Sequence, residues 1–199
     1  MQRVGLYGGC FNPVHQGHLA AARGAMRVLA LDRVVFIPSG IPPLKGAEDL
    51  APGGHRLAML RAALAAEPGM EASAIEIDRQ GPSFTVDTAT DLRATFPADT
   101  ELFFLLGDDC IGRLPHWKGI DRLHAMLRFA ILPRCGNGAR SDDDRLIRLD
   151  LPKVSVSSTQ IRATLARGTR PAASLLPPAV LHYAEQHQIY ASVREQSRV

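Results

Sequence analysis

Short apolar runs alternate along the chain with longer segments in which apolar residues recur every three or four positions. The short runs predict strands, at Arg3–Tyr7, Arg33–Ile37, Ala74–Asp78, Glu101–Leu106, Arg128–Leu132 and Lys153–Val156. The longer segments predict helices, at His15–Leu31, His55–Ala66, Val86–Phe96, Ile120–Met126, Thr159–Ala166 and Pro178–His187. Strands that alternate with helices favour a parallel sheet covered on both faces. With right-handed crossovers, the predicted fold is an α/β doubly wound parallel sheet with C-terminal helices.

The same pattern predicts the domain organisation and the place of a ligand. We expect a single domain over residues 1–190, with a helical part at about 157–190 and a tail at 191–199. Ligands of doubly wound sheets bind beyond the carboxyl ends of the strands. The informative loops should therefore follow Tyr7, Ile37, Leu106 and Val156.

The loop after the first strand carries the strongest chemical signal, the string GGCFNPVHQGH from Gly8 to His18. Gly8 and Gly9 allow a sharp turn and a close approach of the backbone to a phosphate. His15 and His18 stand three residues apart at a predicted helix start, beside free N–H groups and the positive end of the helix dipole. This combination predicts a polyphosphate site. The alternatives are two solvent-facing histidines beside an ordinary turn, or a zinc site, for which no third ligand has a suitable spacing.

A second candidate for phosphate binding is the string VSSTQIR at residues 156–162. Ser157 or Ser158 is a good helix N-cap, and the hydroxyl and N–H groups of such a cap can hold phosphate oxygens. Arg162 lies one turn into the predicted helix and can pair with a phosphate through two N–H groups. The alternative is an ordinary capped helix with a surface arginine.

Composition narrows the class of partner. The chain has a formal net charge of +3 and a sequence pI of about 9.0, which favours anionic ligands. No stripe of Lys and Arg with interleaved aromatic residues is present, so we expect no nucleic acid partner. The cysteines Cys10, Cys110 and Cys135 are few and far apart, which argues against a disulfide framework. Without a signal peptide or a run long enough to cross a membrane, we expect a cytoplasmic protein.

Together, the two strings resemble the GGTFDPxHxGH and ISSTxIR signatures of the nucleotidylyltransferase superfamily. This chain has Cys10 where Thr or Ser is usual, and Asn12 where Asp is common. Segments that resemble the bacterial nicotinate-nucleotide adenylyltransferases extend over almost the whole chain: Pro38–Lys45, Ser83–Thr88, Leu106–Asp109, Leu114–Trp117, Leu176–Val180 with Tyr183, and Ile189–Tyr190. Within them, Leu44 replaces a usual histidine and Phe84 a usual tyrosine.

The resemblance implies a Rossmann-like fold and the transfer of AMP from ATP to nicotinate mononucleotide, which gives deamido-NAD and pyrophosphate. It implies catalytic roles for three residues, His15, His18 and Arg162. It implies contacts to ATP by Gly8, Gly9, Cys10, Phe11, His15, His18, Lys45, Gly107, Asp109, Ser158, Thr159 and Arg162. It implies contacts to the mononucleotide by Ser39, Lys45, Phe84, Thr85 and Trp117.

Two residues of the implied acceptor site also have a physical rationale. Trp117 is the single tryptophan, and an indole can stack on an electron-poor pyridine ring. Thr85 begins a predicted helix, so its hydroxyl and N–H could hold the ring carboxylate at the positive end of the dipole. The arrangement favours the acid over the amide. Partial burial of Trp117 in a loop cluster is the structural alternative.

The implied reaction needs neither a general base nor a covalent intermediate, because the acceptor phosphate is already an anionic nucleophile. We expect Mg²⁺ to enter with ATP and to bridge phosphate oxygens with few protein ligands, so no dedicated protein metal site is expected. At least one of the two histidines should be protonated or a firm N–H donor. Nicotinamide mononucleotide or phosphopantetheine as acceptor, or a nucleotide-binding module without turnover, are the alternatives. The oligomeric state stays open.

Overall fold

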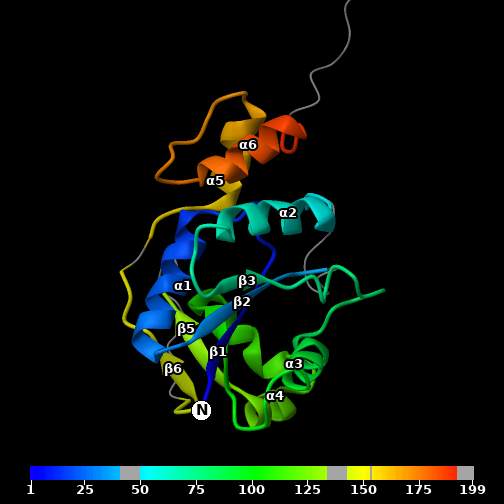
Figure 1. The fold of residues 1–199 in the computed structure, drawn as a ribbon, viewed down its shortest axis with the longest axis vertical. Coiled ribbons are helices and arrows are strands. Elements are labelled where there is room, and N and C mark those ends of the chain that lie inside the picture. The colour runs from blue at the N-terminus through cyan, green and yellow to red at the C-terminus, as the bar shows by residue number, and fades with distance from the viewer. Residues whose placement is uncertain (41–49, 134–142, 153, 192–199) are drawn as a thin grey trace, which may run out of the picture.

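The computed structural model of the chain describes residues 1–40, 50–133, 143–152 and 154–191. Its centre is a six-stranded parallel sheet with the strand order β3-β2-β1-β4-β5-β6 (Figure 1). The strands are β1 Arg3–Gly9, β2 Arg33–Pro38, β3 Met70–Ala72, β4 Glu101–Gly107, β5 Arg128–Leu132 and β6 Leu146–Arg148. The helices are α1 Gln16–Leu29, α2 Gly53–Leu64, α3 Thr85–Arg93, α4 Ile120–Met126, α5 Ser158–Ala166 and α6 Pro178–Gln186, with the 3₁₀ helix η2 at Asp108–His116.

The order of the strands reverses direction at β1, which pairs with β2 on one side and β4 on the other. Val4 stands opposite both Arg33 and Leu102 in these two ladders. In a doubly wound sheet this reversal leaves a crevice beyond the carboxyl ends of the two central strands. The predicted α/β doubly wound fold is therefore confirmed, with its switch point beside the turn that follows β1.

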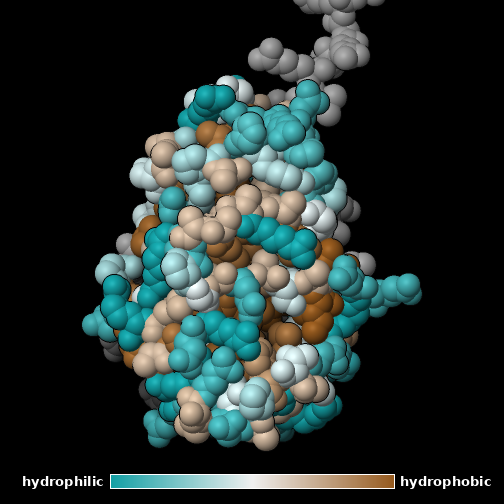
Figure 2. Space-filling model, viewed as in Figure 1, coloured by the Kyte–Doolittle hydropathy of each residue, from teal (hydrophilic) through white to brown (hydrophobic). Residues whose placement is uncertain are grey.

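Both faces of the sheet are covered, as the near-continuous apolar strands predict. Within β4, Phe103 and Leu105 contribute to a core shared with α1, α2 and α6. Leu102, Phe104 and Leu106 contribute to a second core shared with α3 and α4. This alternation follows from the period of two residues in a strand. Polar residues surround an apolar middle on the face of the molecule shown in Figure 2.

The C-terminal helices lie beyond the carboxyl ends of the strands, next to α2 (Figure 1). The backbone N–H of Gln16 donates to the carbonyl of Leu175 at 3.0 Å, which joins the start of α1 to the segment before α6. Nδ1 of His55 and the hydroxyl of Tyr183 lie 3.1 Å apart and link α2 to α6. In the part of the chain that the structure describes, every helix is too short or too polar to cross a membrane.

The strand predicted at Ala74–Asp78 is wrong. The edge strand is instead Met70–Ala72, and residues 75–77 form a turn closed by the Asp78 N–H and the Ala74 carbonyl at 2.9 Å. The alternation of Ile75 and Ile77 has a different origin. Ile75 packs on the core beside α3, whereas Ile77 packs against the start of α2.

The strand predicted at Lys153–Val156 is also wrong where it can be judged, since Lys153 lies outside the described residues. Residues 154–156 form no strand, and the Val156 N–H donates to the Val154 carbonyl in a tight turn at 2.9 Å. The sixth strand is Leu146–Arg148, which pairs with β5. Its three residues are too few for a periodic signal, and tertiary pairing decides their conformation.

Candidate active site

A cavity of about 1210 Å³ opens at the carboxyl ends of β1, β2, β4 and β5. It is the place that the fold predicts for a ligand. The residues proposed from sequence that line it are Gly8, Gly9, Cys10, Phe11, His15, His18, Ser39, Phe84, Thr85, Gly107, Asp109, Trp117, Ser158, Thr159 and Arg162. Lys45 and Leu44 lie outside the described residues. Segments that are far apart in sequence thus meet around one cavity.

The end of β1 and the turn after it depend on a glycine at position 8 and on a left-handed backbone conformation at Phe11. A Cβ atom at Gly8 would lie 2.9 Å from the ring of Phe104, so only glycine fits without a shift of that ring. Phe11 adopts a φ of 45°, a conformation that non-glycine residues seldom take. Its side chain is buried against Tyr7 and Phe36, with ring centroids 5.5 Å from each. Packing of the Phe11 ring therefore holds the turn in its unusual shape.

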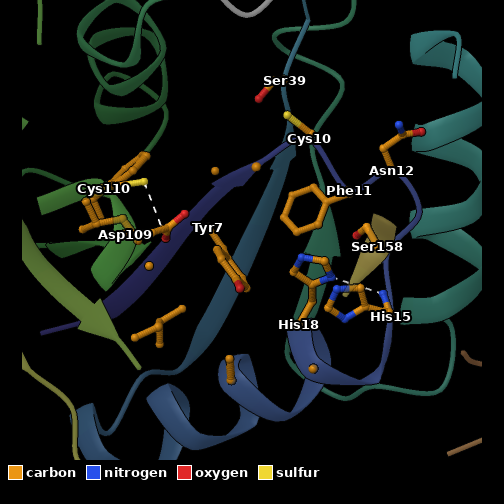
Figure 3. Close-up of a pocket in the computed structure, with 18 of the residues that line it drawn as sticks. Tyr7, Cys10, Phe11, Asn12, His15, His18, Ser39, Asp109, Cys110 and Ser158 are labelled. Carbon is orange, nitrogen blue, oxygen red and sulfur yellow. Dashed lines mark hydrogen bonds between the residues drawn. The ribbon is translucent and has the colours of Figure 1, made fainter. Parts of the chain in front are cut away.

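The two histidines of the turn form a stacked pair at the start of α1 (Figure 3). His15 is the N-cap residue and His18 the third residue of the helix. Their ring centroids lie 3.7 Å apart with the planes inclined by 25°, and both residues are buried. The backbone N–H of His15 donates to Nδ1 of His18 at 3.2 Å. Because Nδ1 accepts, the ring proton of His18 lies on Nε2, which makes this atom a firm N–H donor.

Aromatic rings fix the orientation of His18 from the other side. Phe11 and Tyr7 meet the imidazole edge-on, with centroids 5.0 Å and 6.2 Å from it. A ring held by a stacked neighbour, an edge contact and a hydrogen bond loses little freedom when it binds a ligand. The geometry is that of a preorganised donor at a helix N-terminus, where anions are favoured.

The second predicted phosphate motif lies directly on this turn. The hydroxyl of Ser158 donates to the carbonyl of Pro13 at 3.1 Å, and Nη1 of Arg162 donates to the carbonyl of Asn12 at 2.9 Å. The two motifs are 145 and 150 residues apart in these contacts. The Asn12 contact uses one of the five N–H groups of the guanidinium. Arg162 can therefore hold the turn and an anion together.

Asn12 joins three parts of the chain, a role not predicted from the sequence. Its Oδ1 accepts the backbone N–H of Ala51 at 3.1 Å and the hydroxyl of Tyr190 at 2.7 Å. Burial raises the pKa of the Tyr190 phenol, while Arg162 and Arg56 oppose that shift. The hydroxyl therefore stays protonated and acts as the donor.

Arg56 is a further residue that the sequence analysis missed. It is 2% exposed, and its Nε, Nη1 and Nη2 donate to the carbonyls of Ala51, Cys10 and Ser39 at 2.8, 2.8 and 2.7 Å. Burial lowers the pKa of its guanidinium, with Cys10, Tyr190 and Glu76 opposing. One side chain thus fastens the turn after β1 to the loop after β2. A helical spacing that puts Arg56 on one face with Leu60 and Ala63 could have indicated its burial.

Three of the predicted acceptor residues, Phe84, Thr85 and Trp117, line the α3 side of the cavity, whereas Ser39 lines it from the end of β2. Phe84 is the N-cap of α3 and Thr85 its first residue. Trp117 is half-buried, with edge contacts to Phe104 at 5.8 Å and to Phe129 at 6.3 Å between centroids. Packing on its edge leaves the indole partly exposed within the lining of the cavity. Trp117 therefore packs on two core rings and also lines the cavity.

The end of β4 also brings an acidic side chain into the lining of the cavity. Gly107 ends the strand, and Asp109 follows in η2 with its carboxylate exposed (Figure 3). Among the described residues, no three His, Cys, Asp or Glu side chains cluster closely enough to hold a metal ion. The exposed carboxylate of Asp109 can contribute an oxygen ligand to a cation that a bound phosphate also holds.

Comparisons with known proteins agree on the family of this chain. The cytidylyltransferase-like family matches residues 6–164. A protein of Shouchella clausii named as a probable nicotinate-nucleotide adenylyltransferase is 39% identical over 195 residues, which cover 98% of this chain and 100% of that protein. The nicotinate-nucleotide adenylyltransferase of Bacillus subtilis is 36% identical over 192 residues, which cover 96% and 100%.

Solved structures agree with the fold. The nicotinic acid mononucleotide adenylyltransferase of Plasmodium falciparum, complexed with NaAD, superposes with a TM-score of 0.76 at 16% identity and covers 96% of this chain and 98% of that one. At this identity the match concerns the fold alone. The near-full-length identity to the curated bacterial relatives shows more: the chain belongs to the nicotinate-nucleotide adenylyltransferases, within the cytidylyltransferase-like family.

Proposed function

We propose that the protein transfers AMP from ATP to nicotinate mononucleotide, with deamido-NAD and pyrophosphate as products. The observation that carries the proposal is one cavity with two different walls. One wall holds the stacked histidines and the start of α5, and the other holds the start of α3 with Trp117. Such a cavity suits a reaction that joins two nucleotides. The family names of the relatives support the same reaction.

ATP would bind along the turn after β1, with its phosphates at the starts of α1 and α5. Nε2–H of His18 would donate to an α- or β-phosphate oxygen, with His15 beside it. Arg162, Ser158 and Thr159 would hold the β- and γ-phosphates. Two helix N-termini that face the same volume favour an anion there by their dipoles and N–H groups.

The mononucleotide would bind on the α3 side. Its pyridine ring would stack on Trp117 beside Phe84, and its carboxylate would accept the N–H groups at Thr85. The first backbone N–H groups of a helix have no partners within that helix, so they suit a carboxylate. Ser39, at the end of β2, would contact the mononucleotide from the facing loop, as would Lys45.

The protein's part in the chemistry is alignment and charge stabilisation. An oxygen of the acceptor phosphate attacks the α-phosphorus of ATP, and the bond from that phosphorus to the bridging oxygen of the leaving pyrophosphate breaks. No proton transfer is needed, because both the nucleophile and the leaving group are anions. His18 and Arg162 would stabilise the charge that accumulates on the departing oxygens.

A divalent cation fits this site as a companion of ATP. Adenylyl transfer from ATP generally uses such an ion, and we infer Mg²⁺, which favours phosphate and water oxygens with few carboxylates. When bound, it would neutralise phosphate charge. Asp109, with its exposed carboxylate in the cavity, is the side chain that would approach it.

Incubation of the purified protein with ATP labelled at the α-phosphorus, Mg²⁺ and nicotinate mononucleotide tests the proposal. We expect the label in a dinucleotide with the mass of deamido-NAD, and unlabelled pyrophosphate in equal amount. Binding of ATP without any release of pyrophosphate would instead indicate a nucleotide-binding module. Labelled product only with another phosphate acceptor would keep the chemistry and contradict the acceptor.

A further inference from the structure

We propose that Glu76 is a positioning residue that ties together the two walls of the acceptor pocket and so determines the affinity for the mononucleotide. The inference rests on the proposed function, because it assigns the loop after β2 and the start of α3 to the acceptor. Glu76 lies in the turn between β3 and α3 and lines the cavity.

The first contact of Glu76 is to α3. The hydroxyl of Thr88 donates to Oε1 of Glu76 at 2.8 Å and accepts Nη1 of Arg79 at 2.7 Å. Arg79 also donates to Asp91 at 2.6 Å, one turn further along the helix. Thr88 is 2% exposed and stands three residues after Thr85, so it lies on the same side of α3. Glu76 thereby holds the first turn of the helix that carries Thr85.

The second contact is to the loop after β2. Gly40, the neighbour of Ser39, lies near Glu76, and its backbone N–H opposes the rise in the Glu76 pKa that burial causes. The backbones are also close: a Cβ atom at Gly40 would lie 2.1 Å from the carbonyl oxygen of Glu76 and 3.0 Å from Oγ of Ser83. This is the point at which the loop after β2 meets the segment that leads into α3. Glycine is required there because no side chain fits between them.

A carboxylate suits this junction for a chemical reason. One oxygen accepts the Thr88 hydroxyl and the carboxylate also faces the Gly40 N–H, whereas an amide would turn its NH₂ towards one of these donors. Burial raises the pKa of Glu76, and the Thr88 hydroxyl, Gly40 N–H, Arg79 and Arg56 oppose that shift. A half-buried carboxylate with donors from both walls ties them together, since hydrogen bonds to charged groups exceed neutral ones.

The tie has a specific kinetic consequence. Glu76 acts through Gly40, next to Ser39, and through Thr88, one turn after Thr85, while the stacked histidines lie in the turn after β1. Loosening the tie lets Ser39 and Thr85 move apart, so binding of the mononucleotide weakens. The alignment of the ATP phosphates should be retained. The Michaelis constant for the mononucleotide should therefore change alone.

The test compares four variants of the full chain by steady-state kinetics with ATP and nicotinate mononucleotide. Glu76→Gln should raise the Michaelis constant for the mononucleotide about tenfold or more, with kcat and the Michaelis constant for ATP within about twofold of wild type. Thr88→Val should act in the same direction, and Thr88→Ser, which restores the hydroxyl, should recover the wild-type value. Glu71→Gln is the matched control, because Glu71 is an exposed carboxylate on β3 paired with Arg33.

The outcomes separate the inference from the proposed function. Equal rises in both Michaelis constants, or a loss of kcat alone, would contradict the positioning role and indicate a general structural effect. An unchanged mononucleotide constant in Glu76→Gln and Thr88→Val would also contradict it. Absence of deamido-NAD with the wild-type protein would overturn the proposed function instead. If Glu76→Gln does not fold, the Thr88→Val and Thr88→Ser pair decides by the same criterion.

Discussion

The imidazole of His18 lies face to face with that of His15, and its Nδ1 accepts the His15 backbone N–H at 3.2 Å. Two positively charged rings with centroids 3.7 Å apart would repel one another, so the stacked arrangement favours at most one charge. With Nδ1 engaged by the backbone, His18 would meet an anion through its Nε2–H. The helix start and Arg162 would then supply the positive field for an anion.

Loss of the His18 Nε2–H donor should lower turnover strongly and leave the stability of the fold little changed. We expect His18→Ala to lower turnover by about two to three orders of magnitude, the scale for one transition-state donor. His15→Ala should behave similarly, because His15 holds the His18 ring. His182→Ala, at an exposed position of α6, is the control and should leave turnover unchanged. Near wild-type turnover of His18→Ala, measured as pyrophosphate release, would contradict the phosphate-site assignment.

Trp117 should determine binding of the ring rather than of ATP. Trp117→Ala should raise the Michaelis constant for the mononucleotide at least about tenfold, since stacking and contact area are lost, and leave that for ATP nearly unchanged. Trp117→Phe keeps an aromatic face, so its Michaelis constant for the mononucleotide should lie between those of the wild type and Trp117→Ala. Separate titration of both substrates measures this. Equal effects on the two constants would mean that Trp117 only supports Phe104 and Phe129.

Arg56 should be a determinant of both stability and turnover. Arg56→Lys keeps a charge but cannot serve three carbonyls, so we expect a loss of about 2–4 kcal/mol in the free energy of unfolding. Turnover should fall as well, because the hydrogen bonds of Arg56 that join the turn after β1 to the loop after β2 are lost. Urea unfolding with activity assays measures both. Arg61→Lys, at an exposed position of the same helix, is the control; equal stability of the two variants would contradict the role.

The raised pKa of Glu76 predicts the sign of a pH effect on stability. The folded state holds the Glu76 proton to a higher pH than the unfolded state, whose reference value is 4.5. This contribution to stability is therefore full below about pH 4.5 and is lost as the pH rises through the folded pKa. Glu76→Gln removes the effect. The unfolding free energy of wild type minus that of Glu76→Gln should fall across this range; a difference that rises with pH would contradict the assignment.

The sequence predicted the parts of the site whose chemistry is local. The string from Gly8 to His18 contains its own turn, helix start and donors, and the structure places His15 and His18 at that helix start. The apolar runs of β1, β2, β4 and β5 also determined the sheet. The order of strands confirms the doubly wound fold because right-handed crossovers leave few alternatives.

Interactions between distant segments could not be predicted in the same way. Arg56 donates to three backbone carbonyls. Because every residue has such a carbonyl, the sequence does not show which of them a side chain contacts. Glu76 was assigned to a strand because Ile75 and Ile77 alternate, although the turn places them against two different elements. Short edge strands such as Met70–Ala72 form only because a neighbouring strand supplies the partners.

The decisive measurement compares the two pyridine mononucleotides as acceptors. Steady-state kinetics with saturating ATP and Mg²⁺ would give kcat/KM for nicotinate mononucleotide and for nicotinamide mononucleotide on the same protein. We expect a preference for the acid of about ten- to a hundredfold. The backbone N–H groups at the start of α3 can donate to a carboxylate, whereas the NH₂ of an amide is itself a donor and cannot accept them. Equal kcat/KM values, or a preference for the amide, would contradict the assignment of Thr85 and of the acceptor.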